Sequence, residues 1–169
     1  MSDATATTHF DPARLFRAME VYGHSAALGL KYRAHGADWA QIAMPWRADL
    51  VGDETAQTMA TDAIIGLMDM TAGVSVWTRL AMFRPQATLD LRIDYIRAAH
   101  PRADMVAHCE CYRVTRDIAF VRGSAHDGDA ADPVASMAAC FMFTGPAMPH
   151  RGARQFATGG DGANMAAPA

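Results

Sequence analysis

The sequence of 169 residues has little of several features that mark common functional classes. Three cysteines are an odd number, and too few for the disulfide framework of a small secreted domain. The chain carries one lysine among its 15 basic residues and a formal net charge of −3, so it has no general excess of basic charge for nucleic acid. Its most apolar segment is shorter than the roughly 20 residues that a membrane-spanning helix needs. We therefore expect a small-molecule or protein partner, with no nucleic acid and no membrane.

The first ten residues have neither the basic nor the apolar region of a secretion signal, so we expect a cytoplasmic protein with free thiols. Cys109 and Cys111 lie beside His108, which resembles half of a metal site. No second pair of suitable spacing follows, and a spacing of two residues places both thiols on one face of a strand. We therefore expect no metal and no resident cofactor.

Composition and length fit one domain, since 51% of the residues are apolar and 20% are charged. We expect residues 1–8 to be a flexible terminus, 9–150 a single domain and 151–169 a flexible tail, because neither end has an apolar period.

The first half of the domain contains signals for two helices with extended structure between them. In order, we predict a helix from the N-cap Asp11 and Pro12 to about His24, extended segments over 28–46 broken at 35–38, a polar loop over 47–54, and a helix over 62–79 with Thr58 or Thr61 as N-cap.

Beyond Pro85 the apolar period changes from 3.6 to 2, which is typical of strands. We predict four antiparallel strands at about 88–96, 103–114, 117–125 and 133–144. The first of them should have a dry face made of Leu89, Leu91, Ile93 and Tyr95. Strands that follow one buried helix indicate an α+β fold with the helix packed on a sheet face.

A single carboxylate, Asp69, interrupts a helix that is apolar nearly all round. Burial of an ionised acid is costly unless partners compensate, so the fold does not need this residue for stability. Asp62, Gly66, Asp69 and Gly73 share one narrow stripe of small and acidic side chains. Asp69 either bonds a neighbouring N–H or an arginine such as Arg92 as a packing element, or serves as a base or nucleophile in a desolvated cleft.

Three segments in this order resemble the hotdog-fold acyl-CoA thioesterases of the phenylacetate-degradation (PaaI-like) type. Residues 67–73, LMDMTAG, are similar to the family helix segment L-L-D-x-A-x-G. Residues 87–99 are similar to the family strand that ends in Y/F-x-R-P-A, and residues 113–121 to its arginine-turn-I-A-F-V hairpin. The resemblance covers about residues 28–144. It implies a long central helix wrapped by a curved antiparallel sheet, and homodimers or homotetramers with active sites between protomers.

The resemblance also assigns roles by position. Asp69 matches the catalytic acid, which acts as general base or as nucleophile on the thioester carbonyl. Thr88 matches a Ser or Thr that helps to hold the water from the partner subunit. Thr61 matches the glycine whose backbone N–H binds the thioester oxygen.

The helix N-terminus departs from the family pattern. Ala60-Thr61-Asp62 replaces His-Gly-Gly, and Glu54 stands where the family often has Asn. A backbone N–H at a helix N-terminus still acts as a donor. The Cβ of Thr61 narrows the approach, however, and Asp62 places negative charge near the developing oxyanion.

The leading hypothesis is hydrolysis of an acyl-CoA or similar small thioester, with coenzyme A present only as part of the substrate. Asp62 and Glu54 would border the substrate, and the phosphates of coenzyme A would meet Arg97, Arg113 and Arg116, although solvated surface arginines are the more common case. The alternative is a non-catalytic hotdog module that binds acyl thioesters or hydrophobic ligands. Hydration of enoyl thioesters ranks last, because no His follows Asp62 or Asp69 closely. Met59, Met68 and Met70 are candidates for an acyl pocket.

Overall fold

The computed structural model describes residues 10–21 and 23–147. The expected flexible ends at 1–8 and 151–169 lie outside these residues. In chain order the elements are α1 (Pro12–Met19), α2 (Gly23–Ala27), β1 (Lys31–His35), β2 (Trp39–Met44), the 3-10 turn η1 (Ala48–Leu50), β3 (Val51–Asp53), β4 (Thr58–Met59), α3 (Thr61–Leu80), β5 (Gln86–Tyr95), β6 (Met105–Val114), β7 (Ile118–His126) and β8 (Ala135–Phe143).

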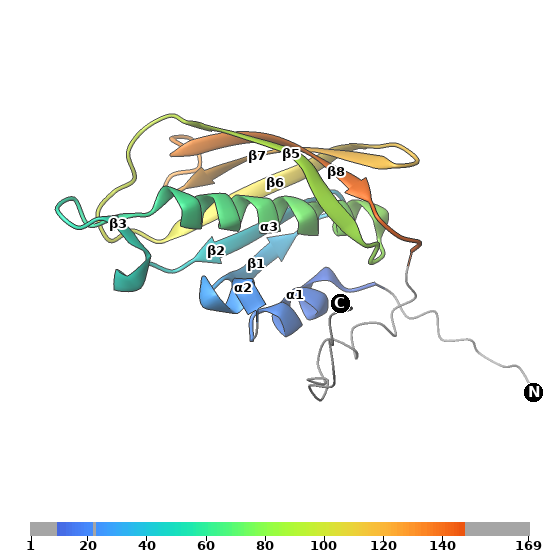
Figure 1. Cartoon of the computed structure of the whole chain (residues 1–169), viewed down its shortest axis with the longest axis horizontal. Helices are drawn as coiled ribbons and strands as arrows, with labels where there is room; N and C mark the ends of the chain where they lie inside the picture. Colours follow the sequence, from blue (N-terminus) through green and yellow to red (C-terminus); the bar gives the residue numbers. More distant parts are fainter. Residues whose placement is uncertain (1–9, 22, 148–169) are drawn as a thin grey trace, which may run out of the picture.

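Six strands form one antiparallel sheet in the order β1-β2-β6-β7-β8-β5. The helix α3 lies across one face of this sheet, chiefly over β2, β6 and β7 (Figure 1). The expected α+β architecture, one long helix wrapped by an antiparallel sheet, is therefore confirmed. Among the described residues the two edges of the sheet are β1 and β5, so no described strand pairs with the outer side of β5.

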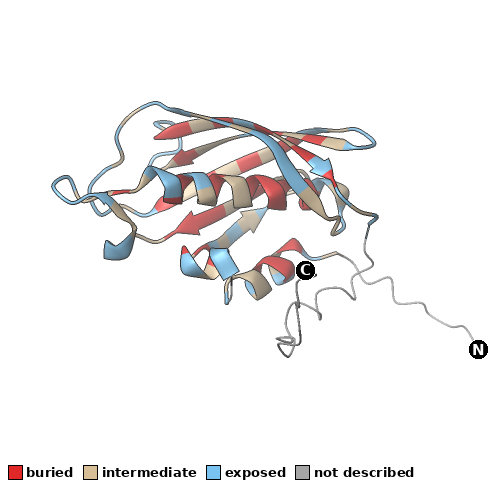
Figure 2. Ribbon diagram, in the orientation of Figure 1, coloured by how far each residue is buried: buried red, intermediate tan, exposed pale blue. Residues whose placement is uncertain are grey.

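The helix α3 is apolar on most of its circumference because most of it is buried between the sheet and the N-terminal helices (Figure 2). Its N-cap is Ala60, which offers no side-chain acceptor, so the prediction of a Thr58 or Thr61 cap is wrong. The backbone at Ala60 is already extended, which makes Thr61 the first helical residue. The helix ends at Ala81, whose left-handed conformation breaks the helical hydrogen-bond ladder.

The N-terminal region differs in part from its prediction. Asp11 caps α1 as expected, since its carboxylate accepts from the backbone N–H groups of Ala13 at 2.9 Å and Arg14 at 3.2 Å. The predicted single helix to His24 is wrong, because α1 ends at Met19 and α2 begins at Gly23, where a positive φ of 73° turns the chain. The predicted polar loop contains η1 and β3, and β3 pairs with β4.

The strands follow the predicted boundaries closely, but the dry face of β5 is only partly dry. Leu91 and Ile93 pack against the core, whereas Leu89 is 50% exposed and Tyr95 is 43% exposed in the single chain. A bulge between Thr88 and Asp90 shifts the register against β8 and interrupts the alternation. The edge position leaves the rest of this face without a covering element.

Three contacts fix how α3 lies along β5. The side chain of Gln86 reaches Gly73, that of Thr88 reaches Asp69, and that of Tyr95 reaches Thr61. Because the strand numbers rise as the helix numbers fall, the two elements run antiparallel. Within the described ranges, no helix is long and apolar enough to cross a membrane.

Candidate active site

The structure brings Asp69 and Thr88 together. Thr88 Oγ1 donates a hydrogen bond of 2.8 Å to Asp69 Oδ1, which joins the middle of α3 to the early part of β5. The contact forms within one chain, whereas the resemblance placed Thr88 on the partner subunit. Arg92 instead pairs with Asp94 at 3.0 Å, so it is not the packing partner that one interpretation of Asp69 required. Asp69 is thus a partly buried acid held by one side-chain hydroxyl.

Behind the acid lies a closed core. Cys109 is buried on the central strand β6, and its thiol lies 3.8 Å from the carbonyl oxygen of Met68. Burial, reinforced by the negative charge of Asp69, holds the pKa of the Cys109 thiol well above its usual range. The thiol is therefore protonated and unreactive, and it offers no competing nucleophile.

The N-terminus of α3 presents an exposed turn that contains Thr61 and Asp62. Asp62 Oδ1 accepts from the N–H of Ala63 at 2.8 Å, and the hydroxyl of Tyr95 donates to the carbonyl oxygen of Thr61 at 2.9 Å. Partial burial, with the charge of Asp62, raises the pKa of Tyr95, so this hydroxyl stays a donor. The first N–H groups of the helix have no acceptor within the helix and carry the positive end of its dipole.

Glu54 lies in the exposed turn between β3 and β4, immediately before the start of α3. Its carbonyl oxygen accepts from Gln57 Nε2 at 2.8 Å, which tightens the turn. Glu54 and Asp62 therefore lie in neighbouring segments of the chain, both at the N-terminal side of the helix.

The three arginines expected to meet phosphates do not lie together. Arg97 follows β5, whereas Arg113 and Arg116 lie at the other end of β7, around the turn from β6. Arg113 is exposed, and the side chain of Arg116 is 93% exposed with Asp117 at 3.4 Å. A single phosphate group therefore cannot contact all three in one chain, because the two ends of β7 lie far apart in the fold.

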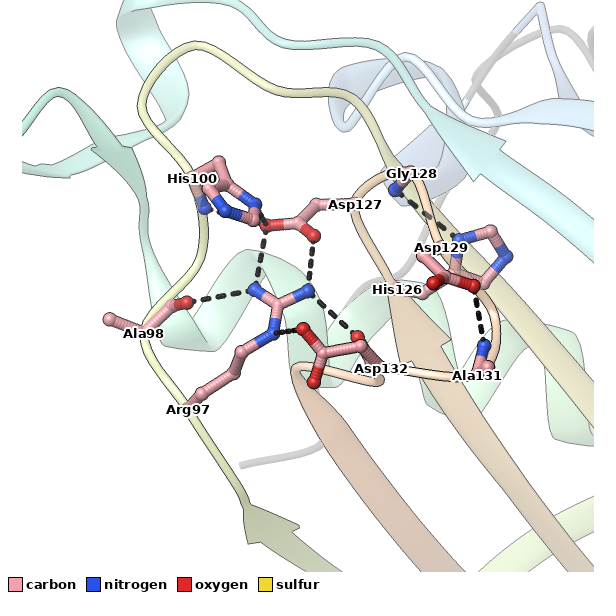
Figure 3. Close-up of polar contacts among 9 residues, drawn as sticks. All are labelled: Arg97, Ala98, His100, His126, Asp127, Gly128, Asp129, Ala131 and Asp132. Carbon is pink, nitrogen blue, oxygen red and sulfur yellow. Dashed lines mark hydrogen bonds and ion pairs between the residues drawn. The ribbon is translucent and has the colours of Figure 1, made fainter.

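Arg97 is held by acceptors of the protein itself (Figure 3). Its two Nη atoms lie 2.6 and 3.1 Å from the carboxylate oxygens of Asp127, and its Nε lies 2.9 Å from the carboxylate of Asp132. The carbonyl oxygens of Ala98 and Asp132 take further bonds of 3.0 and 2.7 Å. With these bonds in place, Arg97 fastens the segment after β5 to the turn between β7 and β8.

Asp127 is the centre of this cluster, and its side chain is 1% exposed. Besides Arg97, it accepts from the backbone N–H of His100 at 2.6 Å and lies 3.0 Å from His100 Nδ1. The Arg97 guanidinium, followed by the donors of His100, holds the pKa of Asp127 well below its usual range. Asp127 was not among the site residues that the sequence predicted.

The three methionines suggested for an acyl pocket have different environments. Met68 is fully buried in the core, and Met59 borders a cavity of about 360 Å³ at the start of α3. Met70 lines another cavity, of about 410 Å³, between α3 and the N-terminal helices. In the part of the chain that the structure describes, no three His, Cys, Asp or Glu side chains gather as metal ligands.

Comparisons with known proteins agree with this architecture. A family model described as the thioesterase superfamily matches residues 63–134. A protein from Pseudomonas aeruginosa with a known crystal structure is 34% identical in sequence to this chain. Its TM-score is 0.68, and the match covers 78% of this chain and 95% of that one. A thioesterase from Haemophilus influenzae is 12% identical, with a TM-score of 0.71 over 86% of this chain and 97% of its own. No curated protein matches the chain in sequence.

A mutant of the phenylacetic acid degradation protein PaaI from Thermus thermophilus is 24% identical, with a TM-score of 0.60 over 70% of this chain and 96% of that one. The helix, the sheet order and the matched segment together define a hotdog-fold protein. The chain belongs to the thioesterase superfamily, and its fold is of the PaaI-like type. This membership supports thioester hydrolysis in general.

Proposed function

We propose that the protein hydrolyses an acyl-CoA, or a similar small acyl thioester, to a free acid and a thiol. The observation that carries the proposal is the Asp69–Thr88 pair, a carboxylate held by a hydroxyl at 2.8 Å on an otherwise apolar helix. An acid with one local donor keeps a free oxygen for a water molecule or for a thioester carbon. Thr88 fixes the orientation of the carboxylate and can hold the same water.

As general base, Asp69 removes a proton from water while the water oxygen attacks the thioester carbon. The carbonyl oxygen becomes an oxyanion, and a helix N-terminus supplies the N–H of Thr61 with the positive end of the dipole behind it. Collapse of this intermediate breaks the C–S bond, and the proton on Asp69 passes to the departing thiolate. If Asp69 attacks directly, a C–O bond to the carboxylate forms, the C–S bond breaks, and the thiolate leaves and takes a proton from water. The resulting mixed anhydride is then cleaved by water, which releases the free acid and regenerates Asp69.

Thr61 and Asp69 of one chain do not reach the same carbonyl group. Eight helical residues separate them, which is about 12 Å along the axis. A second protomer solves this problem if its helix lies antiparallel, because its Thr61 then faces Asp69. The free edge of β5 and the exposed side chains of Leu89 and Tyr95 offer a surface for that pairing. We therefore propose a homodimer or larger assembly with sites between protomers.

Substitution of Asp69 tests the proposal. We expect Asp69→Asn to lower kcat by roughly 100-fold to 10,000-fold, because general-base catalysis contributes about that factor. Thiol release from a panel of short, medium and aryl acyl-CoAs measures it. Asp117→Asn is the matched control, since it removes an exposed carboxylate at the β6–β7 turn and should leave the rate unchanged. Equal rates for wild type and Asp69→Asn would refute the proposed mechanism.

The second candidate is a non-catalytic module that binds an acyl thioester. Asp62 favours it, because an exposed carboxylate in the first turn of α3 opposes an oxyanion at that helix end. Absence of thiol release from every acyl-CoA, with acyl-CoA binding detected by calorimetry, would establish this candidate instead.

A further inference from the structure

The cavity of about 410 Å³ lies between α3 and the two N-terminal helices. Leu15, Ala18 and Met19 of α1 line one side, and Met70 and Trp77 of α3 line the other. Its volume falls near the lower end of the roughly 300–1,000 Å³ of small-molecule sites. Such a cavity, lined mainly by apolar side chains, fits an unbranched hydrocarbon chain better than a charged group.

Neither Asp69 nor Thr88 lines the cavity, but a neighbour of each does. Met70 follows Asp69 on α3, and Gln86 precedes Thr88 by two positions, on the same face of β5. Gln86 Nε2 donates to the carbonyl oxygen of Gly73 at 2.8 Å, which is the contact between α3 and β5 next to the Thr88–Asp69 contact. The cavity therefore lies along the same stretch of α3 and β5 as the Asp69–Thr88 pair.

Two aromatic rings, those of Trp77 and Phe83, line the part of the cavity that lies toward the C-terminal end of α3. The ring centroids of Trp77 and Phe83 lie 4.9 Å apart, and the indole N–H of Trp77 donates to the carbonyl oxygen of Arg84 at 2.9 Å. Met70 and Trp77 are seven residues apart, so they share a face of α3 and lie about 10 Å apart along its axis. An extended chain gains about 1.2 Å per bond, so about eight bonds fit in this length.

We infer that this cavity takes the acyl chain of the substrate and that the N-terminal helices, with the Trp77–Phe83 wall, limit it to medium length, near eight carbons. The inference rests on the proposed thioesterase function and adds the substrate class. The helices α1 and α2 lie outside residues 63–134, which match the family model. One wall of the cavity therefore comes from a segment that the superfamily signature does not include, and the opposite wall, with Trp77 and Phe83, comes from the matched segment.

Two substitutions with opposite effects test the inference. Ala18→Leu adds bulk to the α1 wall, and we expect kcat/KM for octanoyl-CoA to fall about tenfold while that for butanoyl-CoA stays nearly constant. Phe83→Ala removes the end wall, and we expect the preference for dodecanoyl-CoA over octanoyl-CoA to rise about tenfold. Ala27→Leu, at an exposed position of α2, and Phe120→Ala, on β7, are the matched controls, since neither residue lines the cavity.

A binding measurement separates this inference from the proposed function. Calorimetry with octanoyl-CoA and butanoyl-CoA in the Asp69→Asn background needs no turnover, and Ala18→Leu should weaken only the octanoyl complex. Loss of octanoyl binding without any turnover by the wild type would refute the enzyme while supporting the acyl cavity. Turnover that depends on Asp69, with a chain-length profile unchanged in both Ala18→Leu and Phe83→Ala, would overturn the cavity assignment alone. If Ala18→Leu does not fold, the Phe83→Ala profile decides.

Discussion

Asp69 and Asp127 are both aspartates at the edge of the core, and their hydrogen bonds differ sharply. Asp127 takes four bonds, two from Arg97 and two from His100, and its side chain is 1% exposed. Asp69 takes one side-chain bond, from Thr88, and is partly exposed. A carboxylate with all its lone pairs occupied is a structural fastener, whereas one with a free oxygen can accept a proton from a substrate water. The number of hydrogen-bond donors around each carboxylate therefore distinguishes the structural Asp127 from the Asp69 that we propose to be reactive.

The same comparison shows that the guanidinium of Arg97, which was expected to contact phosphates, already has acceptors within the protein. Arg97 follows β5, at the arginine position of the Y/F-x-R-P-A segment that the family resemblance names. The carboxylates of Asp127 and Asp132 already neutralise its charge. Its bonds hold the segment over the start of α3, where Thr58, Met59 and Thr61 border the cavity of about 360 Å³. The Arg97–Asp127 cluster therefore holds the backbone of residues 97–99 beside the N-terminus of α3.

Removal of the charge at each aspartate gives the largest expected contrast in stability. Asp127→Asn leaves Asp132 as the remaining carboxylate of Arg97 and places a neutral amide among the donors of a buried site, so we expect the free energy of unfolding to fall by about 2 kcal/mol. Asp69→Asn keeps its volume and has one hydroxyl neighbour, so we expect little change. Urea denaturation of both variants measures the contrast. An equal decrease in the free energy of unfolding of the two variants would contradict the distinction between a structural Asp127 and a reactive Asp69.

The pH dependence of stability sharpens the contrast between the two aspartates. The folded-state pKa of Asp127 lies below the ordinary value of about 3.9, so the unfolded chain binds this proton first as the pH falls. The stabilisation is therefore complete above about pH 4 and decreases as the pH falls below that value. We expect the stability gap between wild type and Asp127→Asn to narrow over that interval. A gap that stays constant to pH 2 contradicts the assignment.

The sequence pattern was sufficient for the elements that depend on local periodicity. The buried helix with Asp69 and the four strands after Pro85 follow from apolar spacing. The family resemblance singled out Thr88 as a residue that helps to hold the water from the partner subunit, whereas the structure shows it bonded to Asp69 of its own chain. The position of β5 at a sheet edge did not follow, because it depends on which strands pair, and Leu89 was expected on a dry face.

Contacts between distant segments could not be predicted either, because they also depend on how the elements pack and not on local periodicity. Arg97 and Asp127 are thirty positions apart, and nothing in the local pattern distinguishes their pairing from two solvated side chains. The cavity beside Met70 needs α1 to fold back against α3, which the apolar face of α1 allows but does not specify. The Ala60 cap likewise depends on an extended backbone that follows β4, where residue preference would favour a threonine.

Thr88 offers a smaller and more local test of the reactive acid. Thr88→Val keeps the shape of the side chain and removes its donor, so we expect kcat to fall about tenfold while the midpoint of thermal unfolding hardly moves. Thr88→Ser restores the hydroxyl and should keep most of the activity. If Thr88→Val instead lowers stability as much as Asp127→Asn does, the Asp69–Thr88 contact is a second fastener.

Substitution of Asp62 tests the part of the proposed site at the N-terminus of α3, where the Thr61 N–H would bind the oxyanion. It has the smallest expected effect. It lies exposed in the first turn of α3, where its charge suits the helix dipole but opposes an oxyanion bound by the Thr61 N–H. We expect Asp62→Asn to raise kcat/KM about two- to fivefold at low salt, and less at high salt because ions screen exposed charges. Asp62→Glu keeps the charge and should leave the rate unchanged. A slower Asp62→Asn enzyme would mean that this carboxylate assists the reaction. The proposal that an oxyanion binds at the Thr61 N–H would then be contradicted.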